Sequence, residues 1–293
     1  MQPDSSIVTQ IALGVLTIIF APLVAGFLSG IDRIFTARLQ GRIGPPILQP
    51  FYDVFKLLGK ELIVVNKLQL VWAWGFFGFS AASLVLLIVQ QDILLVVFSI
   101  GFAGICLSLG ALSVRSPYSY LGGMRELMQM LSYEPILLAS VVAIYIVNGS
   151  YMVGDILSSP MPLLARLPLV FLALLIVLTI KMRKSPFDIS TAHHAHQEII
   201  KGVTTEYSGP YLALIEFGHW YEMMFVLTLI ALFWAQPLWV GVLIALAAFL
   251  AEMLIDVTWA RLTWRWMLRT TWAVGLGLVA LNLMILTFLY RIK

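Results

Sequence analysis

The sequence has little charge and almost no cysteine. Of its 293 residues, 11% are charged and 61% are hydrophobic, whereas about 25% of the residues in an ordinary soluble domain are charged. So few polar groups cannot cover the surface of a soluble globule, which excludes a soluble enzyme. The single cysteine, Cys106, excludes an internal disulfide, and it excludes an iron–sulfur cluster held by this chain, because such a cluster takes four thiolates. Any redox centre must therefore belong to a partner.

Long apolar windows take up most of the chain. A membrane-spanning helix needs about 20 apolar residues, whereas a barrel strand needs only about 9–11 alternating ones. We therefore predict an all-α integral membrane protein with about eight transmembrane helices, arranged as a single polytopic membrane domain over residues 1–293. We expect no cleaved signal peptide, because the first window is too long for one. The windows fall near residues 7–28, 69–89, 93–114, 127–147, 168–182, 212–235, 238–259 and 270–290.

The basic residues are distributed unevenly between the two sets of loops. Fifteen Lys and Arg residues lie in the odd-numbered loops, and three lie in the termini and the even-numbered loops. The positive-inside rule then places the odd-numbered loops in the cytoplasm and both termini outside. Two cytoplasmic loops, near residues 29–68 and 183–209, are long and polar, and the first contains an amphipathic stretch that should lie at the membrane interface. We expect a soluble partner to dock on this side.

Ionisable residues recur inside the predicted spans, where each is costly unless it faces protein or water. Glu216, His219 and Glu222 share one side of the sixth span, and Glu252 and Asp256 share one side of the seventh. Buried ion pairs that fix helix register and a hydrated path for protons both explain such groups. Carboxylates outnumber nearby bases inside the spans, which favours the proton path. Further clusters are Arg125, Glu126, Ser132, Tyr133 and Glu134 in the fourth span, and Lys201, Thr204, Thr205, Glu206 and Tyr207 before the sixth.

Three histidines, His193, His194 and His196, lie together in the fifth loop, close to Glu198. A metal site is one interpretation of this cluster. However, no cysteine assists, and the spacing lacks the His-Glu-x-x-His pattern of zinc hydrolases. We favour hydrogen bonding, proton relay or contact with a partner, and predict no metal ligand in the chain.

Three cytoplasmic blocks carry a family resemblance. They are GRIGPPILQPFYDVFKLLGKE at residues 41–61 with Asp32 and Arg33 upstream, GMRELMQMLSYE at residues 123–134, and residues 185–209 with Pro186-Phe187-Asp188 and Glu206-Tyr207-Ser208-Gly209. In this order they resemble the subunit 1 family of respiratory complex I and of bacterial NADH-quinone oxidoreductase, together with the related energy-converting hydrogenases. The stretch STAHHAHQEIIKG departs from the acidic stretch of the quinone-reducing branch. In this respect the chain is more similar to the membrane subunit of multisubunit [NiFe] hydrogenases of the Ech, carbon-monoxide-linked or formate-hydrogenlyase kind.

The resemblance implies a non-catalytic membrane subunit of a redox-driven, ion-pumping hydrogenase complex in a prokaryotic cytoplasmic membrane. Such a membrane protein has no cofactor of its own. The [NiFe] centre and [4Fe-4S] clusters are expected in its partners, which would be hydrogenase large and small subunits, ferredoxin-like iron–sulfur subunits and an antiporter-like membrane subunit, with the lipid bilayer around it and no nucleic acid. A quinone-binding subunit of a complex I-like dehydrogenase is the alternative. A free-standing secondary transporter fits less well, because the sequence shows no inverted repeat.

The resemblance also implies roles for individual residues. One group is expected at the interface with the peripheral arm, and a second group is expected to form the proton or ion path. The interface residues are Arg38, Arg42, Gln49, Arg125 and Arg183, and the path residues are Glu134, Asp188, Glu198, Glu206, Glu216, His194, His196, His219, Glu222, Glu252 and Asp256.

Overall fold

The structure, a computed structural model, describes residues 4–159, 161–190 and 201–291, and over these residues it is built from helices. The described residues contain no β-strand, and only an isolated antiparallel bridge joins Asp92 and Met152. The predicted all-α fold is confirmed. The α-helices are α1 (Asp4–Leu39), α2 (Gln49–Leu58), α3 (Lys67–Ile88), α4 (Ile93–Leu112), α5 (Pro117–Asn148), α6 (Val153–Ser158), α7 (Leu163–Arg166), α8 (Pro168–Lys181), α9 (Gly209–Ala231), α10 (Leu238–Thr258), α11 (Trp264–Thr270) and α12 (Gly277–Arg291).

Seven helices of the described part of the chain are long and apolar enough to cross a membrane. Six of them are α1, α3, α4, α5, α9 and α10. The seventh runs through α11, a π-helical segment at Thr271–Leu276 and α12. The predicted fifth span is the 14-residue α8, which is about 21 Å long at 1.5 Å per residue and so falls short of a bilayer core of about 30 Å. Most of its residues are buried by neighbouring helices, so the short helix is enclosed by protein.

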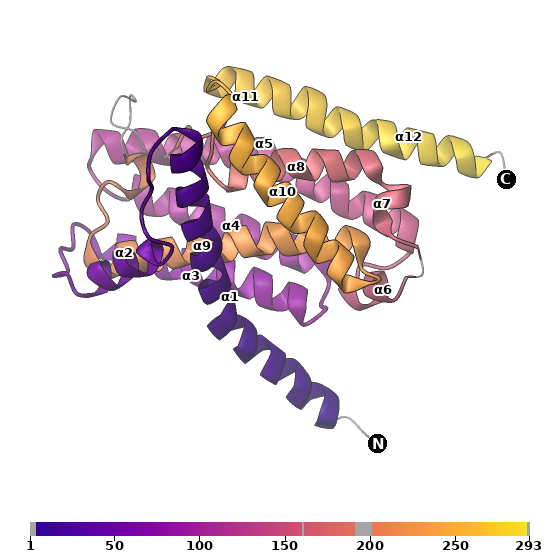
Figure 1. The fold of residues 1–293 in the computed structure, drawn as a ribbon, viewed down its shortest axis with the longest axis horizontal. Helices are drawn as coiled ribbons and strands as arrows, with labels where there is room; N and C mark the ends of the chain where they lie inside the picture. The colour runs from indigo at the N-terminus through magenta and orange to yellow at the C-terminus, as the bar shows by residue number, and fades with distance from the viewer. Residues whose placement is uncertain (1–3, 160, 191–200, 292–293) are drawn as a thin grey trace.

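The helices form a bundle with distinct ends (Figure 1). α3, α4, α5, α8 and α9 run roughly along one direction, and α3 packs extensively on both α4 and α9. α1 and α10 cross one side of this layer obliquely. α2 lies at one end of the bundle, and α6 and α7 lie at the other. This arrangement puts the first long loop and the connection between α5 and α8 at opposite ends, as the alternation of loops along the sequence predicts.

The amphipathic stretch predicted in the first loop is α2, and two glycines of α1 let it pack closely. A Cβ atom at Gly26 would collide with the ring of Phe51, and one at Gly30 would collide with the carbonyl oxygen of Ile47. Phe51 therefore reaches into the bundle, where its ring centroid lies 5.3 Å from that of Phe27 and 5.5 Å from that of Trp220. The first loop is in this way held against α1 and α9.

Candidate functional site

The end of α8 supplies the bases of the buried polar interior. The helix ends at Lys181, and Arg183 then adopts a left-handed conformation with φ of 51°, which costs roughly 1–2 kcal/mol for a residue with a Cβ atom. Lys181 and Arg183 point toward α5 and α9, whereas Lys184 reaches Asp32 of α1. Cations are also favoured at a helix C-terminus, where the carbonyl dipoles point outward. One short segment thus serves two clusters of charges.

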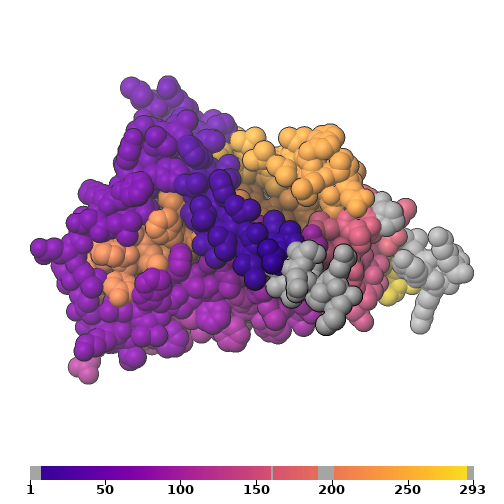
Figure 2. Space-filling model, turned by 90° about the horizontal axis from the view of Figure 1, so that it is seen from below, coloured from indigo at the N-terminus to yellow at the C-terminus, as the bar shows by residue number. Residues whose placement is uncertain are grey.

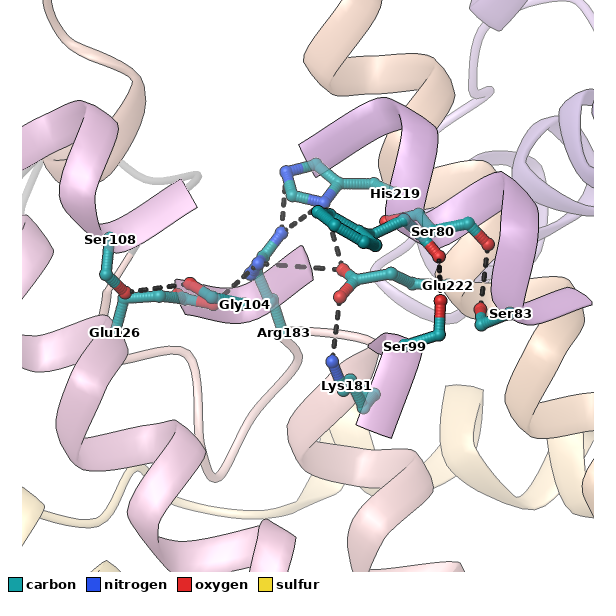
Figure 3. Close-up of polar contacts among 11 residues, drawn as sticks. Ser80, Ser83, Ser99, Gly104, Ser108, Glu126, Lys181, Arg183, His219 and Glu222 are labelled. Carbon is teal, nitrogen blue, oxygen red and sulfur yellow. Dashed lines mark hydrogen bonds and ion pairs between the residues drawn. The ribbon is translucent and has the colours of Figure 1, made fainter. Parts of the chain in front are cut away.

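The inner cluster consists of Glu126, Lys181, Arg183, His219 and Glu222 (Figure 3). Glu222 accepts a hydrogen bond from Lys181 at 2.7 Å and lies 3.7 Å from Arg183. Arg183 also pairs with Glu126 at 2.7 Å and contacts the ring of His219, whose Nε2 atom is 2.6 Å from its Nη1 atom. His219 Nδ1 lies 3.3 Å from Glu222. The arrangement joins α5, α8 and α9 through one continuous set of contacts.

Charges in the inner cluster balance. Two carboxylates, Glu126 and Glu222, face two bases, Lys181 and Arg183, and the side chain of Glu222 is only 1% exposed. Desolvation of each charge is costly, and it is offset only while the opposite charge stays in place. The expectation that carboxylates outnumber their bases inside the spans is therefore wrong for this cluster. Its carboxylates and its bases come from different segments of the chain.

A polar strip extends from the inner cluster along the contact between α4 and α5. Buried oxygens of Gln129 and Tyr133 lack a hydrogen-bond partner among the described residues, and such groups in proteins are generally satisfied by ordered water. Glycines of α4 make room for the strip. A Cβ atom at Gly101 would collide with Glu134, and one at Gly104 would lie 3.1 Å from the hydroxyl of Tyr133. The strip can therefore hold water between the inner cluster and Glu134.

The outer cluster lies on the other side of α8, toward α1 and α10. Lys184 forms an ion pair with Asp32, and Arg261 pairs with Asp188 at 2.5 Å. Asp256 accepts a hydrogen bond from the backbone N–H of Ser185 at 2.9 Å. Glu252 is buried, interacts electrostatically with Lys184, Asp256 and Asp32, and has one oxygen without a hydrogen-bond partner among the described residues. The outer cluster is Asp32, Lys184, Asp188, Glu252, Asp256 and Arg261.

Carboxylates are in excess in the outer cluster, and the effect is evident at Asp188. This residue lies in the connection after α8. Burial raises the pKa of Asp188 from its ordinary value of 3.8 to about 6, while Arg261 opposes the shift and the nearby charge of Asp256 adds to it. A group with this pKa exchanges protons within the physiological range. The outer cluster can therefore take up and release protons, whereas the balanced inner cluster holds charge in place.

The predicted path residues fall into several places. His219 and Glu222 lie in the inner cluster, and Asp188, Glu252 and Asp256 lie in the outer cluster. Glu134 is half-buried beside α4. Two further residues are half-buried outside both clusters, Glu206 near the start of α9 and Glu216 beside α2. Outside the described residues lie His193, His194, His196 and Glu198.

The predicted interface residues also separate. Arg38 and Arg42 are exposed at the end of the bundle that carries α2. Gln49 is half-buried and donates a hydrogen bond to Asp53. The half-buried Arg125 contacts the carbonyl oxygen of Ile189 at 3.5 Å. Arg183 differs from the expectation most, because its left-handed turn carries the guanidinium into the inner cluster and away from the surface.

Sequence reasoning missed the partners that complete both clusters. Glu126 stands beside the predicted Arg125, and Lys181 closes the fifth window. Lys184 and Asp32 belong to segments 152 residues apart. A basic residue at the end of an apolar run, followed by two more within three positions, was the available signal. In the part of the chain that the structure describes, no group of three or more His, Cys, Asp or Glu side chains is arranged to hold a metal ion.

Comparisons with known proteins agree with this architecture. Residues 11–287 match the NADH dehydrogenase family. A membrane subunit of the NADH-quinone oxidoreductase of Syntrophobacter fumaroxidans is 29% identical over 92% of this chain and 93% of its own length. Formate hydrogenlyase subunit 4 of Escherichia coli is 29% identical over 67% of this chain and 68% of its own length.

A solved structure has the same fold. In the membrane-bound sulfane sulfur reductase, an archaeal respiratory membrane complex, one chain superposes with a TM-score of 0.86 at 24% identity, covering 94% of this chain and 99% of that one. At this identity the likeness establishes the fold. With the match over residues 11–287 and the seven apolar helices, the chain belongs to the NADH dehydrogenase family, as a multi-pass membrane protein of the complex I subunit 1 group.

Proposed function

We propose that this chain is the membrane subunit of an energy-converting [NiFe] hydrogenase, in which it anchors the electron-carrying arm and passes the energy of electron transfer to H⁺ or Na⁺ translocation. Reduced ferredoxin, or a carbon-monoxide- or formate-oxidising partner, would supply the electrons, and protons would accept them. The expected partners are the hydrogenase large and small subunits, ferredoxin-like iron–sulfur subunits and an antiporter-like membrane subunit. These partners would hold the [NiFe] centre and the [4Fe-4S] clusters.

The observation that carries the proposal is the position of the two clusters around the end of α8. Arg183 and Asp188 belong to the connection between α8 and α9, which lies at the same end of the bundle as α2. Their partners, Glu222 and Arg261, belong to other segments. A change of charge or position at this connection therefore alters interactions inside the bundle. No separate redox group in this chain is needed for such coupling.

The proposed coupling is electrostatic. Electron transfer in the docked arm changes the charge near the connection between α8 and α9, and Asp188 responds by gaining or losing a proton at its carboxylate. Lys184 and Glu252 then respond, because both belong to the same cluster. In the inner cluster, Glu222 holds Lys181 and Arg183 in register. The polar strip along α5 leads from there to Glu134, which would hand the proton or the electrostatic change to the neighbouring subunit.

The hydrogenase assignment rests on two further features. The chain is similar to formate hydrogenlyase subunit 4 over two thirds of its length. Its fifth loop carries histidines in the stretch where quinone-reducing relatives are expected to carry carboxylates. The positive-inside rule gives the orientation, with both termini outside and Arg38 and Arg42 on the cytoplasmic side, available to acidic groups of the arm.

Purification of the complex from its native membrane tests the assignment. We expect a nickel-containing large subunit to co-purify and hydrogen to evolve with an artificial electron donor. Arg38→Ala and Arg42→Ala should release the arm, whereas Arg265→Ala, outside the predicted interface, should not. An arm that stays attached in both variants would contradict the docking role, and a complex without nickel would contradict the hydrogenase.

A quinone-binding subunit of a complex I-like dehydrogenase is the second candidate. It is favoured by the NADH-quinone oxidoreductase protein of Syntrophobacter fumaroxidans, which is similar over 92% of this chain. The two candidates differ in their response to quinone. If the second is correct, the purified complex reduces a short-chain quinone and a quinone-site inhibitor stops the reaction. If the first is correct, hydrogen evolution continues unchanged with the inhibitor present.

A further inference from the structure

A recess lies between α1, α2 and α9, apart from both charge clusters. Its volume is about 280 Å³, and it is lined by residues of α1, α2, the segment before α9 and α9 itself. Figure 2 shows part of α9, in orange, surrounded by indigo and purple segments at this end of the molecule. The recess sits where the amphipathic α2 meets the bundle, which is the level of lipid headgroups for an interfacial helix.

Positive charge dominates the lining. Four basic side chains line it, together with two carboxylates, Asp53 and Glu216. One basic residue, Arg33, is neutralised by Asp53 at 2.5 Å, and Gln49 also donates to that carboxylate at 2.9 Å. These contacts lower the pKa of Asp53 although partial burial raises it, so Asp53 stays charged. The remaining basic residues outnumber Glu216 by three to one; they are Lys56, Lys60 and Lys201.

The three lysines make no ion pair with any described residue. Two of them lie four residues apart on α2, so they share one face of that helix, and the third approaches from the segment before α9. Each ammonium group offers three hydrogen-bond donors and no acceptor. Three such groups around a small recess suit a ligand with several anionic oxygens, and phosphate is the common chemical group of that kind.

The surroundings of the recess are apolar. Val54, Leu57 and Trp220 form part of its wall. On the outer side of α2 and just after it, Phe55 is 66% exposed and Ile63 is 69% exposed. Apolar side chains exposed beside an interfacial helix are stabilised by acyl chains. A polar recess with an apolar border matches a molecule that carries a phosphate head and hydrocarbon tails.

We propose that this recess binds the phosphate headgroup of an anionic membrane lipid through Lys56, Lys60 and Lys201, with the acyl chains lying along the exposed apolar side chains of α2. The lipid would hold α2 against α1 and α9. Free inorganic phosphate has the same anionic oxygens, but it gains nothing from the apolar border. The proposal does not depend on whether the arm is a hydrogenase or a quinone reductase.

Native mass spectrometry of the intact detergent-solubilised complex tests the site with phosphatidylglycerol as the probe. We expect Lys56→Gln/Lys60→Gln to weaken phosphatidylglycerol binding at least fivefold. Lys67→Gln/Arg115→Gln removes two exposed charges outside the recess and should change binding less than twofold. Zwitterionic phosphatidylcholine should bind more weakly than phosphatidylglycerol to the wild-type complex.

A second variant covers the case in which the double variant fails to assemble. Glu216→Gln removes the carboxylate that opposes the lysines, so phosphatidylglycerol binding should tighten at least twofold. Unchanged binding in both Lys56→Gln/Lys60→Gln and Glu216→Gln would overturn the site. Displacement of the bound lipid by millimolar inorganic phosphate, with the phosphate remaining bound, would overturn the assignment to a lipid.

Discussion

The inner and outer clusters share one segment at the end of α8 but differ in their balance of charge. In the inner cluster two carboxylates face two bases, and each carboxylate contacts a base within 2.7 Å. In the outer cluster four carboxylates, at residues 32, 188, 252 and 256, share two bases. Balanced pairs hold their ionisation state because each charge stabilises the other. An excess of buried carboxylates favours proton uptake, because like charges and desolvation both oppose ionisation.

This difference assigns separate tasks to the two clusters. The inner cluster fixes the register of α5, α8 and α9, which is the structural role that buried pairs commonly have. The outer cluster contains the groups that can change protonation. Buried charge in a membrane protein is therefore not evidence for a proton path until its partners are known.

The largest effect is expected at the carboxylate that two bases share. Glu222→Gln leaves Lys181 and Arg183 buried with one carboxylate between them, which should lower the free energy of unfolding by about 3–5 kcal/mol. Denaturation of the purified subunit in detergent measures this change. Glu216→Gln, on the same helix and without an ion pair among the described residues, is the control and should change stability little. Equal losses in both variants would remove the register role of the inner cluster.

The next effect depends on pH and arises from Asp188. Its raised pKa means that the protonated carboxyl contributes stability that is fully present below pH 3.8 and is lost as the pH rises through about 6. A shift of this size corresponds to about 3 kcal/mol. Asp188→Asn should remove this component, so its stability should change less than that of the wild type between pH 4 and 7. Thermal unfolding at several pH values measures the difference, and parallel curves for the two proteins would contradict the assignment.

A smaller effect of opposite sign is expected at Glu252. This buried carboxylate forms no ion pair among the described residues, so Glu252→Gln removes a desolvated charge and should raise stability by about 1 kcal/mol or leave it unchanged. Ion translocation should nevertheless fall, because the amide cannot titrate. The same unfolding assay and a vesicle assay measure the two properties. A loss of stability as large as that of Glu222→Gln would show that the clusters do not differ.

The smallest effect tests the polar strip. Gly104→Ala places a methyl group 3.1 Å from the hydroxyl of Tyr133, which should cost about 1 kcal/mol or less and reduce coupling moderately. Gly78→Ala is the matched control, since no atom lies within 4 Å of the new methyl group, and it should stabilise α3 by up to about 1 kcal/mol. Stability and translocation are measured together. Equal coupling in the two variants would exclude the strip from the path.

Much of the fold could be predicted from the sequence. The lengths of the apolar runs predict the long helices, and the alternation of charged and apolar residues after Pro50 predicts α2. The fifth window was the exception, because apolar composition does not distinguish a helix in lipid from one enclosed by protein. α8 is the second kind.

The candidate site was less predictable, because its contacts join distant segments. Lys181 and Glu222 are 41 residues apart, and only the packing of α8 on α9 brings them together. The left-handed turn at Arg183 sends inward a side chain that its loop position places at the surface. Glu216 and Glu222 lie about 120° apart around α9, so they face different neighbours despite their common helix. Spacing along one helix identified the carboxylates but not their partners.

The ratio of ions moved to hydrogen evolved in sealed vesicles tests the coupling role most directly. The complex is reconstituted with Glu134→Gln or with Glu216→Gln, and both activities are followed with an artificial electron donor. We predict that Glu134→Gln retains hydrogen evolution while its ratio falls at least tenfold, and that Glu216→Gln keeps both. An unchanged ratio in Glu134→Gln would contradict the account.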